Sequence, residues 1–461
     1  MSAIRLSSPF RSLISTRSLP SSRRLTRPFT MTTKDEFKQQ PHKSVIIVSD
    51  PRQGSSSFAM LYIDFLCMYP VRLIVITPAS TVFCRIPGPI EVADEVLFAN
   101  AHPSMSHISP DFIPVFGDSI RMTREVLLTK SGQPFLISGS GTLGWDQVAA
   151  NLVEQGENAL VLHSGYFGDS FNDCLETYGA NVKQLKAPIG RAVTSSELEK
   201  ELKSGKKYKI VTVTHVDTST GVLSNVKEVA ALVRRISPDT LVAVDAVCSV
   251  ASEEIRFDDW DLDIVLTASQ KGLGTPPGLS ILVASKRALE VYKSRKSPPA
   301  SYYASWKKWL PIMNAYESGT AAYFATPPVN LMYAYHASLQ LIVKGEITLS
   351  ERLKMHKDAS RAVKDAAKRL GLKQLPELEE EAANGMTALY FPEGLTASDI
   401  LPRLAKRGVV VAGGLHTAIK DKYFRIGHMG LSVVDAQRGD VNTVIRALED
   451  TLKEARAAKL A

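Results

Sequence analysis

Short apolar runs alternate with helical stretches from about residue 85 to about residue 345, and this alternation constrains the fold more than any other feature. Fully apolar runs are typical of strands buried on both faces, and regular alternation with helices is typical of a parallel sheet. The expected strands are 135–138, 159–162, 209–214, 241–245, 264–267 and 279–283. The expected helices include 143–154, 226–236, 328–343 and 349–370. The sequence therefore predicts an α/β fold with a large, mostly parallel sheet covered by helices on both faces.

The pattern changes beyond that point. A charged helix is followed by expected strands near 386–391 and 409–411 and by a closing helix from Asp435. This order predicts a smaller α+β domain at the C-terminus. We place the large domain at residues 85–330 and the small domain at residues 331–461.

Positive charge is concentrated at the N-terminus. Residues 1–34 hold seven Lys or Arg and no Asp or Glu, so the formal charge of +8 leaves +1 for the rest of the chain. A nearly neutral remainder predicts no nucleic-acid partner. The leader is also rich in Ser, and an Arg-rich, Ser-rich, acid-free leader is typical of a transit peptide. We predict a transit peptide at residues 1–31 and a mitochondrial location.

Two other features suggest alternative locations. Met31 offers a second start, which would give a cytosolic product without the leader. Ala458-Lys459-Leu460 resembles a peroxisomal targeting signal, although one further alanine separates it from the C-terminus. The peroxisome and the cytosol are therefore the alternatives to mitochondria.

Residues 32–84, between the leader and the large domain, are irregular. Pro, Gly and Ser separate their short apolar runs, and they hold no motif. We expect residues 42–84 to be an insertion outside both domains, such as an untranslated sequence wrongly read through. The most apolar part of the segment is interrupted by Asp64, Pro70 and Arg72, so the sequence predicts no membrane span.

The cysteines give no sign of a metal site or of disulfide bonds. Cys67, Cys84, Cys174 and Cys248 form no Cys-x-x-Cys pair and show no metal-like spacing with histidine. We expect free thiols in a reducing compartment and no bound metal.

A glycine-rich turn, Ser138-Gly139-Ser140-Gly141-Thr142-Leu143-Gly144, joins an expected strand to an expected helix. Free amides at a helix start favour an anion such as a phosphate. The turn also satisfies G-x-G-x-x-G, so a dinucleotide site is an alternative. A dinucleotide site needs an acid after the next strand, which ends instead in His163-Ser164-Gly165. The turn therefore favours a single phosphate group, with a plain strand-to-helix connection as the other interpretation.

An aspartate and a lysine end two further strands. Asp245 closes the run 241–245, and Lys271 follows the run 264–267. Adjacent parallel strands would bring both side chains to the carboxyl edge of the sheet, where open α/β sheets bind ligands. Pyridoxal 5′-phosphate needs a lysine amine for its Schiff base and an acid that keeps its pyridine nitrogen protonated. Together with the phosphate turn, the two residues predict a pyridoxal phosphate site. For either residue alone, a salt bridge or a loop cap is the alternative.

Three other segments fit such a site. Phe167, in Tyr166-Phe167-Gly168, offers a ring that stacks on a flat cofactor, unless it belongs to the core. Residues 215–221 offer hydroxyls to a polar ligand, or form a capping turn. Arg425 lies in a short apolar stretch, where a guanidinium grips a substrate carboxylate through two parallel hydrogen bonds. A salt bridge between domains is the alternative for Arg425.

The motifs in chain order resemble one family. They are RIPGP from Arg85, then SGSGT, HVDTSTG, VDAVCS, SQKGLGTPPG, YFATPPVN and FRIGHMG. Together they resemble the class V aminotransferases, and within that family the alanine–glyoxylate (serine–pyruvate) aminotransferases. The resemblance extends from about Arg85 to the C-terminus. It implies the type I architecture of pyridoxal-phosphate-dependent transferases and a homodimer with shared active sites.

The resemblance also implies a role for each matching residue. Lys271 would carry pyridoxal 5′-phosphate, and Asp245 would pair with its pyridine nitrogen. Phe167 would stack on the ring, Thr218 would lie beside the phenolic oxygen, and Arg425 would bind the substrate carboxylate. The phosphate would be bound by Ser140, Gly141, Thr142 and Gln270, and from the neighbouring subunit by Tyr323 and Thr326.

The implied substrates are small amino acids and 2-oxo acids. The expected reaction moves the amino group of L-alanine to glyoxylate by a ping-pong mechanism, giving pyruvate and glycine, with serine–glyoxylate or serine–pyruvate transfer as the alternative. A cysteine desulfurase would need a cysteine after the lysine, and none follows Cys248. A nicotinamide-dependent oxidoreductase would need the missing ribose acid, and a simple binding protein would have no use for Lys271 beside Asp245.

Overall fold

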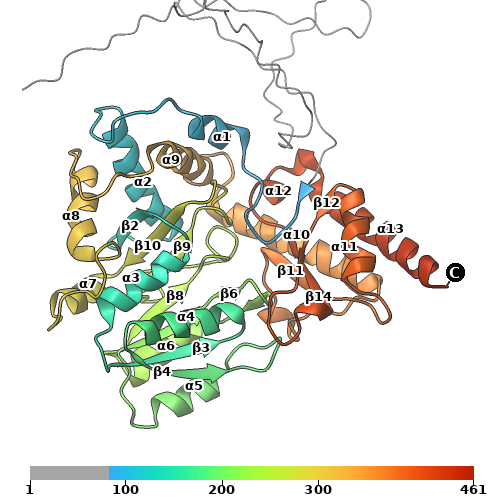
Figure 1. Ribbon diagram of the computed structural model, residues 1–461, viewed down its shortest axis with the longest axis horizontal. Coiled ribbons are helices and arrows are strands. Elements are labelled where there is room, and N and C mark those ends of the chain that lie inside the picture. Colours follow the sequence, from blue (N-terminus) through green and yellow to red (C-terminus); the bar gives the residue numbers. More distant parts are fainter. Residues whose placement is uncertain (1–82, 461) are drawn as a thin grey trace, which may run out of the picture. The chain divides into compact units, whose positions relative to one another are not determined.

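The computed structural model describes residues 83–460, and a seven-stranded sheet lies at their centre (Figure 1). Strand β10 runs antiparallel to both of its neighbours, and the other pairs are parallel. The predicted α/β fold with a mostly parallel sheet is therefore confirmed. The strands, in their order across the sheet, are β2 (Gln133–Ser138), β10 (Leu279–Ala284), β9 (Ile264–Ala268), β8 (Leu241–Asp245), β5 (Ile210–Thr214), β3 (Asn158–His163) and β4 (Asn181–Lys186).

Helices cover the sheet. Every residue of β5, β8, β9 and β10 is buried, so both faces of these strands are shielded from water. α3 packs against α4 and α7, α5 packs against α6, and α2 packs against α8 and α9. The helices of this part are α1 (Asp94–Asn100), α2 (Phe112–Val126), α3 (Thr142–Leu152), α4 (Tyr166–Thr177), α5 (Ser195–Leu202), α6 (Val226–Ile236), α7 (Lys286–Lys293), α8 (Trp306–Glu317) and α9 (Val329–Val343).

The C-terminal part has a hydrophobic core of its own, which includes Val363, Leu389, Ile400, Phe424 and Leu448. Its sheet has the order β11-β14-β13 and is antiparallel. The elements are α10 (Leu349–Arg369), β11 (Met386–Tyr390), α11 (Ala397–Lys406), β12 (Val409–Val410), β13 (Ala412–Gly413), β14 (Tyr423–Gly427), α12 (Leu431–Val434) and α13 (Asp440–Leu460).

The start of the described chain is tied to this C-terminal part. Strand β1 (Phe83–Cys84) pairs in parallel with β12. The backbone N–H of Arg85 donates to the Val410 carbonyl at 2.7 Å, and the N–H of Gly427 donates to the Arg85 carbonyl at 2.6 Å. The last two residues of the expected insertion 42–84 therefore form a strand.

One predicted boundary differs from the structure, and others lie outside the described residues or stay predictions. The closing helix begins at Asp440 rather than Asp435, because Gly439 has the left-handed φ of 62° and ends a short 3-10 turn before it. The predicted transit peptide and nearly all of residues 32–84 lie outside the described residues. The domain boundary after residue 330 stays a prediction; α9, which starts beside it, packs against α1 and α2.

No helix among the described residues is long and apolar enough to cross a membrane. Within residues 83–460 we also find no cluster of His, Cys, Asp or Glu that would hold a metal ion.

Candidate active site

Asp245 and Lys271 meet at the carboxyl edge of the large sheet. Asp245 is the last residue of β8, and Lys271 follows shortly after the adjacent parallel strand β9. Their exposed fractions are only 3% and 8%. Each charge affects the other group: Lys271 lowers the pKa of Asp245, and Asp245 raises the pKa of Lys271. The strand pattern predicted this meeting, and the structure brings the two residues together.

The Asp245 carboxyl is buried away from solvent. Burial raises its pKa to about 6, although two donors favour the ionised form. The backbone N–H of Val247 donates to Oδ1 at 3.1 Å, and the indole Nε1–H of Trp145 donates to Oδ2 at 2.9 Å. The nearby Asp217 carboxylate also raises the pKa. A positively charged partner brought to Asp245 would therefore pull it into the ionised form.

The Lys271 amine is covered by the segment that begins at Arg85. Its Nζ donates a hydrogen bond to the Pro87 carbonyl. Gly88 has a φ of 99°, and a Cβ added there would overlap the Lys271 side chain, so only glycine allows this approach. Burial lowers the pKa of Lys271, which favours the neutral, nucleophilic amine.

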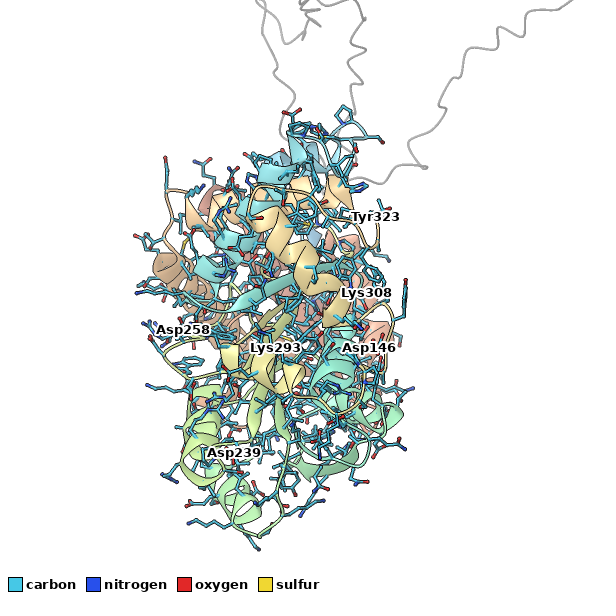
Figure 2. All side chains as sticks on the ribbon, turned by 90° about the vertical axis from the view of Figure 1, so that its left-hand side faces the viewer. Asp146, Asp239, Asp258, Lys293, Lys308 and Tyr323 are labelled. Atoms are coloured by element: carbon cyan, nitrogen blue, oxygen red, sulfur yellow. The ribbon has the colours of Figure 1, made fainter. Side chains whose placement is uncertain are left out.

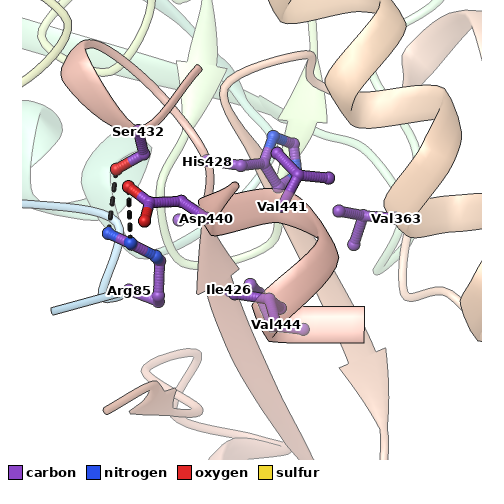
Figure 3. A pocket seen from close by; sticks show the side chains of 9 residues that line it. Arg85, Val363, Ile426, His428, Ser432, Asp440, Val441 and Val444 are labelled. Atoms are coloured by element: carbon purple, nitrogen blue, oxygen red, sulfur yellow. Dashed lines mark hydrogen bonds and ion pairs between the residues drawn. The ribbon is translucent and has the colours of Figure 1, made fainter. Parts of the chain in front are cut away.

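The same segment is anchored by buried ion pairs (Figure 3). Arg85 pairs with Asp440 through Nη2 at 2.8 Å and with Glu91 through Nη1 at 3.2 Å, and its Nη1 also donates to Ser432 Oγ at 2.9 Å. Arg438 pairs with the same two carboxylates. This network holds the segment that begins at Arg85, and that covers Lys271, against the C-terminal helices.

The glycine-rich turn is built to receive a phosphate. Helix α3 starts at Thr142, and within the described chain the backbone N–H groups of Gly141 and Thr142 donate to no protein acceptor. The Ser140 and Thr142 hydroxyls lie side by side and share a hydrogen bond. A Cβ added to Gly141 would come 2.9 Å from Val247, so a larger residue would crowd the turn beside Asp245. Free amides, paired hydroxyls and a helix N-terminus fit a phosphate group.

Phe167 is held by a residue that the sequence did not single out. Asp217 is fully buried, and its Oδ2 accepts the backbone N–H of Phe167 at 3.1 Å at the start of α4. Its Oδ1 accepts the N–H of Ser219 at 2.9 Å. The Phe167 ring lies 6.4 Å from the ring of Trp145, which contacts Asp245. Asp217 ends strand β6 (Val216–Asp217), which pairs antiparallel with β7 (Val222–Leu223). The available signal for Asp217 was an aspartate two residues before a serine.

Arg425 and Thr218 also meet. Arg425, in β14, donates from Nη1 to the Thr218 carbonyl at 3.0 Å and from Nε to the Gly413 carbonyl at 2.8 Å. Burial lowers its pKa, and its charge affects the pKa of Lys271. None of the described carboxylates forms an ion pair with Arg425, so the structure does not support a salt bridge between domains. A half-buried guanidinium that pairs with none of the described carboxylates fits an incoming anionic substrate.

Cys248 is a second neighbour that the sequence did not assign to the site. Its thiol is buried, and the charges of Lys271 and Arg425 both affect it. Burial raises its pKa, so the thiol stays protonated at neutral pH. A protonated, buried thiol is a poor nucleophile, which argues against desulfurase chemistry at this position.

Three other predicted phosphate ligands, Gln270, Tyr323 and Thr326, make contacts elsewhere. Gln270 contributes its backbone carbonyl, which accepts the N–H of Ile90 at 3.0 Å. Tyr323 is 65% exposed on the face that Figure 2 shows, and its hydroxyl lies 3.4 Å from Thr326 Oγ1. The role of these three residues at the phosphate stays a prediction.

A buried lysine and aspartate at the carboxyl edge of the sheet, beside a phosphate turn, define the site of a pyridoxal-phosphate-dependent enzyme. The family model described as aminotransferase class-V matches residues 93–437, and the chain belongs to this family. Its cofactor is pyridoxal 5′-phosphate, whose phosphate, ring nitrogen and aldehyde fit the turn, Asp245 and Lys271 respectively.

Named relatives agree with this family. Alanine–glyoxylate aminotransferase 1 of Saccharomyces cerevisiae is 41% identical over 75% of this chain and 91% of its own length. Serine–glyoxylate aminotransferase of Arabidopsis thaliana is 29% identical over 75% and 84%, respectively. The crystal structure of alanine–glyoxylate aminotransferase from Nostoc sp. superposes with a TM-score of 0.75 at 28% identity, covering 83% of this chain and 98% of that one.

Proposed function

We propose that this aminotransferase moves the amino group of L-alanine to glyoxylate, producing pyruvate and glycine in a ping-pong reaction. The reaction class rests on the family and on the site around Lys271. The substrate pair rests on the 41% identity to a yeast alanine–glyoxylate aminotransferase across nearly its whole length. A relative named for a serine donor, at 29% identity, gives the alternative less support.

Each residue of the site would have a separate role in the reaction. When bound, pyridoxal phosphate supplies a ring that accepts the electrons left on the substrate Cα after its proton is removed. The Gly141 and Thr142 amides would hold the phosphate. Asp245 would keep the ring nitrogen protonated through its carboxylate. Burial lowers the pKa of Lys271, which favours the neutral form of its amine. In that form the amine would take the proton from the substrate Cα, and in the second half of the reaction it would give a proton to the Cα of the product amino acid.

A donor screen tests the substrate pair. The enzyme loaded with pyridoxal phosphate is given glyoxylate with either L-alanine or L-serine, and pyruvate, hydroxypyruvate and glycine are quantified. We expect kcat/KM to be at least about tenfold higher for alanine, a discrimination of about 1.4 kcal/mol. Equal or higher kcat/KM for serine would replace alanine by serine in the proposal. A loaded enzyme that converts neither donor would overturn it.

We also propose a homodimer in which each chain completes its partner's phosphate site. Tyr323 and Tyr302 are exposed aromatic residues, and Lys308 lies 5.4 Å from the centre of the Tyr302 ring on the same face (Figure 2). Exposed aromatic side chains are typical of protein interfaces. Light scattering of the purified chain measures the oligomeric state directly, and a monomer that retains full activity would contradict shared sites.

Replacing Arg425 is expected to weaken substrate binding more than it slows the chemistry. Arg425→Gln removes the charge that would bind the substrate carboxylate, so we expect KM for alanine to rise about 10- to 100-fold, the value of one or two charge-assisted hydrogen bonds. Arg425→Lys keeps the charge and should give an intermediate KM. Arg403→Gln, on the surface helix α11, serves as the control and should leave KM unchanged. A fall in kcat at constant KM would contradict the carboxylate role.

A further inference from the structure

Arg352 is a buried arginine whose partners are backbone carbonyls. It lies in the first turn of α10 and is only 7% exposed. Its Nε donates to the Ala251 carbonyl at 3.1 Å, and its Nη2 donates to the Gly272 carbonyl at 2.9 Å. Within residues 83–460 no carboxylate forms an ion pair with it. Burial of a guanidinium is unfavourable, and here it lowers the pKa of Arg352 to about 10. A buried arginine without a carboxylate partner is therefore expected to have a specific role.

The two carbonyls belong to the two loops that bear the candidate catalytic residues. Gly272 directly follows Lys271, and Ala251 lies in the turn that follows Asp245. The loops touch, because a Cβ added to Gly272 would overlap the Val250 carbonyl. The guanidinium of Arg352 therefore bridges the loop after β8 to the loop after β9 at their point of contact.

Ala251 adds a second observation. Its φ is +62°, a left-handed conformation that is unfavourable for a residue with a Cβ. Non-glycine residues persist in this region only where the surroundings enforce it. The hydrogen bond from Arg352 to the Ala251 carbonyl supplies such a constraint from a distant part of the sequence.

The same helix also reaches the strand that carries Arg425. One turn after Arg352, His356 Nδ1 lies 2.7 Å from the Arg352 carbonyl, and its Nε2 lies 3.0 Å from the backbone N of Gly430. Burial lowers the pKa of His356 to about 3, so the ring is neutral and donates from Nδ1 while it accepts at Nε2. Gly430 follows the end of β14, so α10 contacts the loops after β8 and β9 and also the segment that follows the strand of Arg425.

We propose that Arg352 is a positioning residue for the cofactor site. Its guanidinium fixes the loop of Lys271 relative to the loop of Asp245, and this spacing sets how tightly and in what orientation pyridoxal phosphate is held. The proposal rests on the proposed function of Lys271 and Asp245. Arg352 itself touches only protein, and it acts through the two loops.

Cofactor binding to the cofactor-free protein gives the decisive measurement. We compare Arg352→Met, which keeps an unbranched apolar stem without the guanidinium, with Arg352→Lys, which keeps the charge but not the paired donors. The dissociation constant of pyridoxal phosphate is measured by equilibrium dialysis, and the orientation of the bound ring by visible circular dichroism. We expect at least a tenfold rise in the dissociation constant and a reduced dichroic band for Arg352→Met. Arg352→Lys should show a smaller rise.

Arg234 provides a matched control at the opposite end of the same two strands. Its Nη1 donates to the Thr240 carbonyl at 2.7 Å, and its Nε donates to Asp261 Oδ2 at 2.7 Å. Thr240 precedes β8, and Asp261 precedes β9. Arg234→Met therefore removes a comparable bridge far from the site. It should lower the stability to urea while the cofactor dissociation constant stays within about twofold of wild type.

Each outcome decides the proposal. A dissociation constant unchanged in Arg352→Met, or one raised equally in Arg234→Met, would show that Arg352 only supports the fold. If Arg352→Met does not fold, it is combined with Ala251→Gly, which removes the unfavourable φ, and the dissociation constant must still rise. Failure of the wild-type protein to bind pyridoxal phosphate would overturn the proposed function instead, so the two failures are distinguishable.

Discussion

Lys271→Ala is expected to reduce kcat for transamination by about 10⁴-fold, the upper range for loss of a positioned acid–base group. The amine is the group that exchanges with the incoming substrate and carries its Cα proton. Another lysine at this edge of the sheet, Lys186 at the end of β4, is paired with Asp169 at 3.1 Å. Turnover is measured with alanine and glyoxylate after loading with pyridoxal phosphate. Borohydride should trap the cofactor on the wild-type chain and not on the variant.

Measuring the stability of Lys271→Ala to urea distinguishes a loss of catalysis from unfolding of the variant. A buried amine whose pKa is lowered by burial contributes little to folding, so Lys271→Ala should unfold in urea at a concentration close to wild type. Lys286→Ala, at the exposed start of α7, is the control and should keep full turnover. Wild-type turnover by Lys271→Ala would remove the lysine from the mechanism.

Asp245→Asn is expected to reduce kcat by about 10²- to 10³-fold, because a neutral amide does not stabilise a proton on the ring nitrogen. The amide oxygen still accepts a hydrogen bond from Trp145 or Val247, so the local structure should persist. Affinity for pyridoxal phosphate should fall as well. The measurements are turnover and the cofactor dissociation constant, and an unchanged kcat would contradict the role of the carboxylate.

The pH dependence of cofactor binding checks the same group. In the cofactor-free protein the pKa of Asp245 is raised to about 6, so the carboxyl is protonated below this pH. The cofactor pairs with the carboxylate, and binding below pH 6 must release the proton. Affinity should therefore fall as the pH decreases, by up to about tenfold per unit. Asp245→Asn should bind with a flat profile between pH 5 and 7, and a slope equal to that of wild type would assign the titration elsewhere.

The sequence predicted the central strands well because their residues are apolar throughout. The run 241–245 became β8 with the same bounds, and 226–236 became α6 likewise. Strand β4 escaped prediction because it lies at the edge of the sheet, where half-exposed polar residues replace the apolar run. Gly439 displaced the start of the last helix through a backbone conformation that no hydrophobic pattern reveals.

Some residues of the candidate site could likewise be predicted from the sequence, and others could not. Asp245 and Lys271 were predictable because Asp245 ends β8 and Lys271 follows the end of β9, and the ends of adjacent parallel strands meet at one edge of the sheet. The residues that hold the site residues in place could not be predicted, because each of these contacts joins residues far apart in sequence. Trp145 lies 100 residues from Asp245, Asp217 lies 50 from Phe167, and Arg352 lies 101 from Ala251. Such pairs have no local pattern, and only the folded chain brings them together.

The anchoring of Arg85 has a consequence for how the enzyme is made. Asp440, its partner, opens the last helix, and Pro87, two residues after Arg85, contacts Lys271. A chain still on the ribosome without its final 21-residue helix has synthesised both candidate catalytic residues but leaves Arg85 short of one carboxylate. The segment that covers Lys271 therefore gains the Asp440 anchor only once the chain has been synthesised as far as α13. A premature stop before Asp440 is expected to disturb the active site even though both candidate catalytic residues are present.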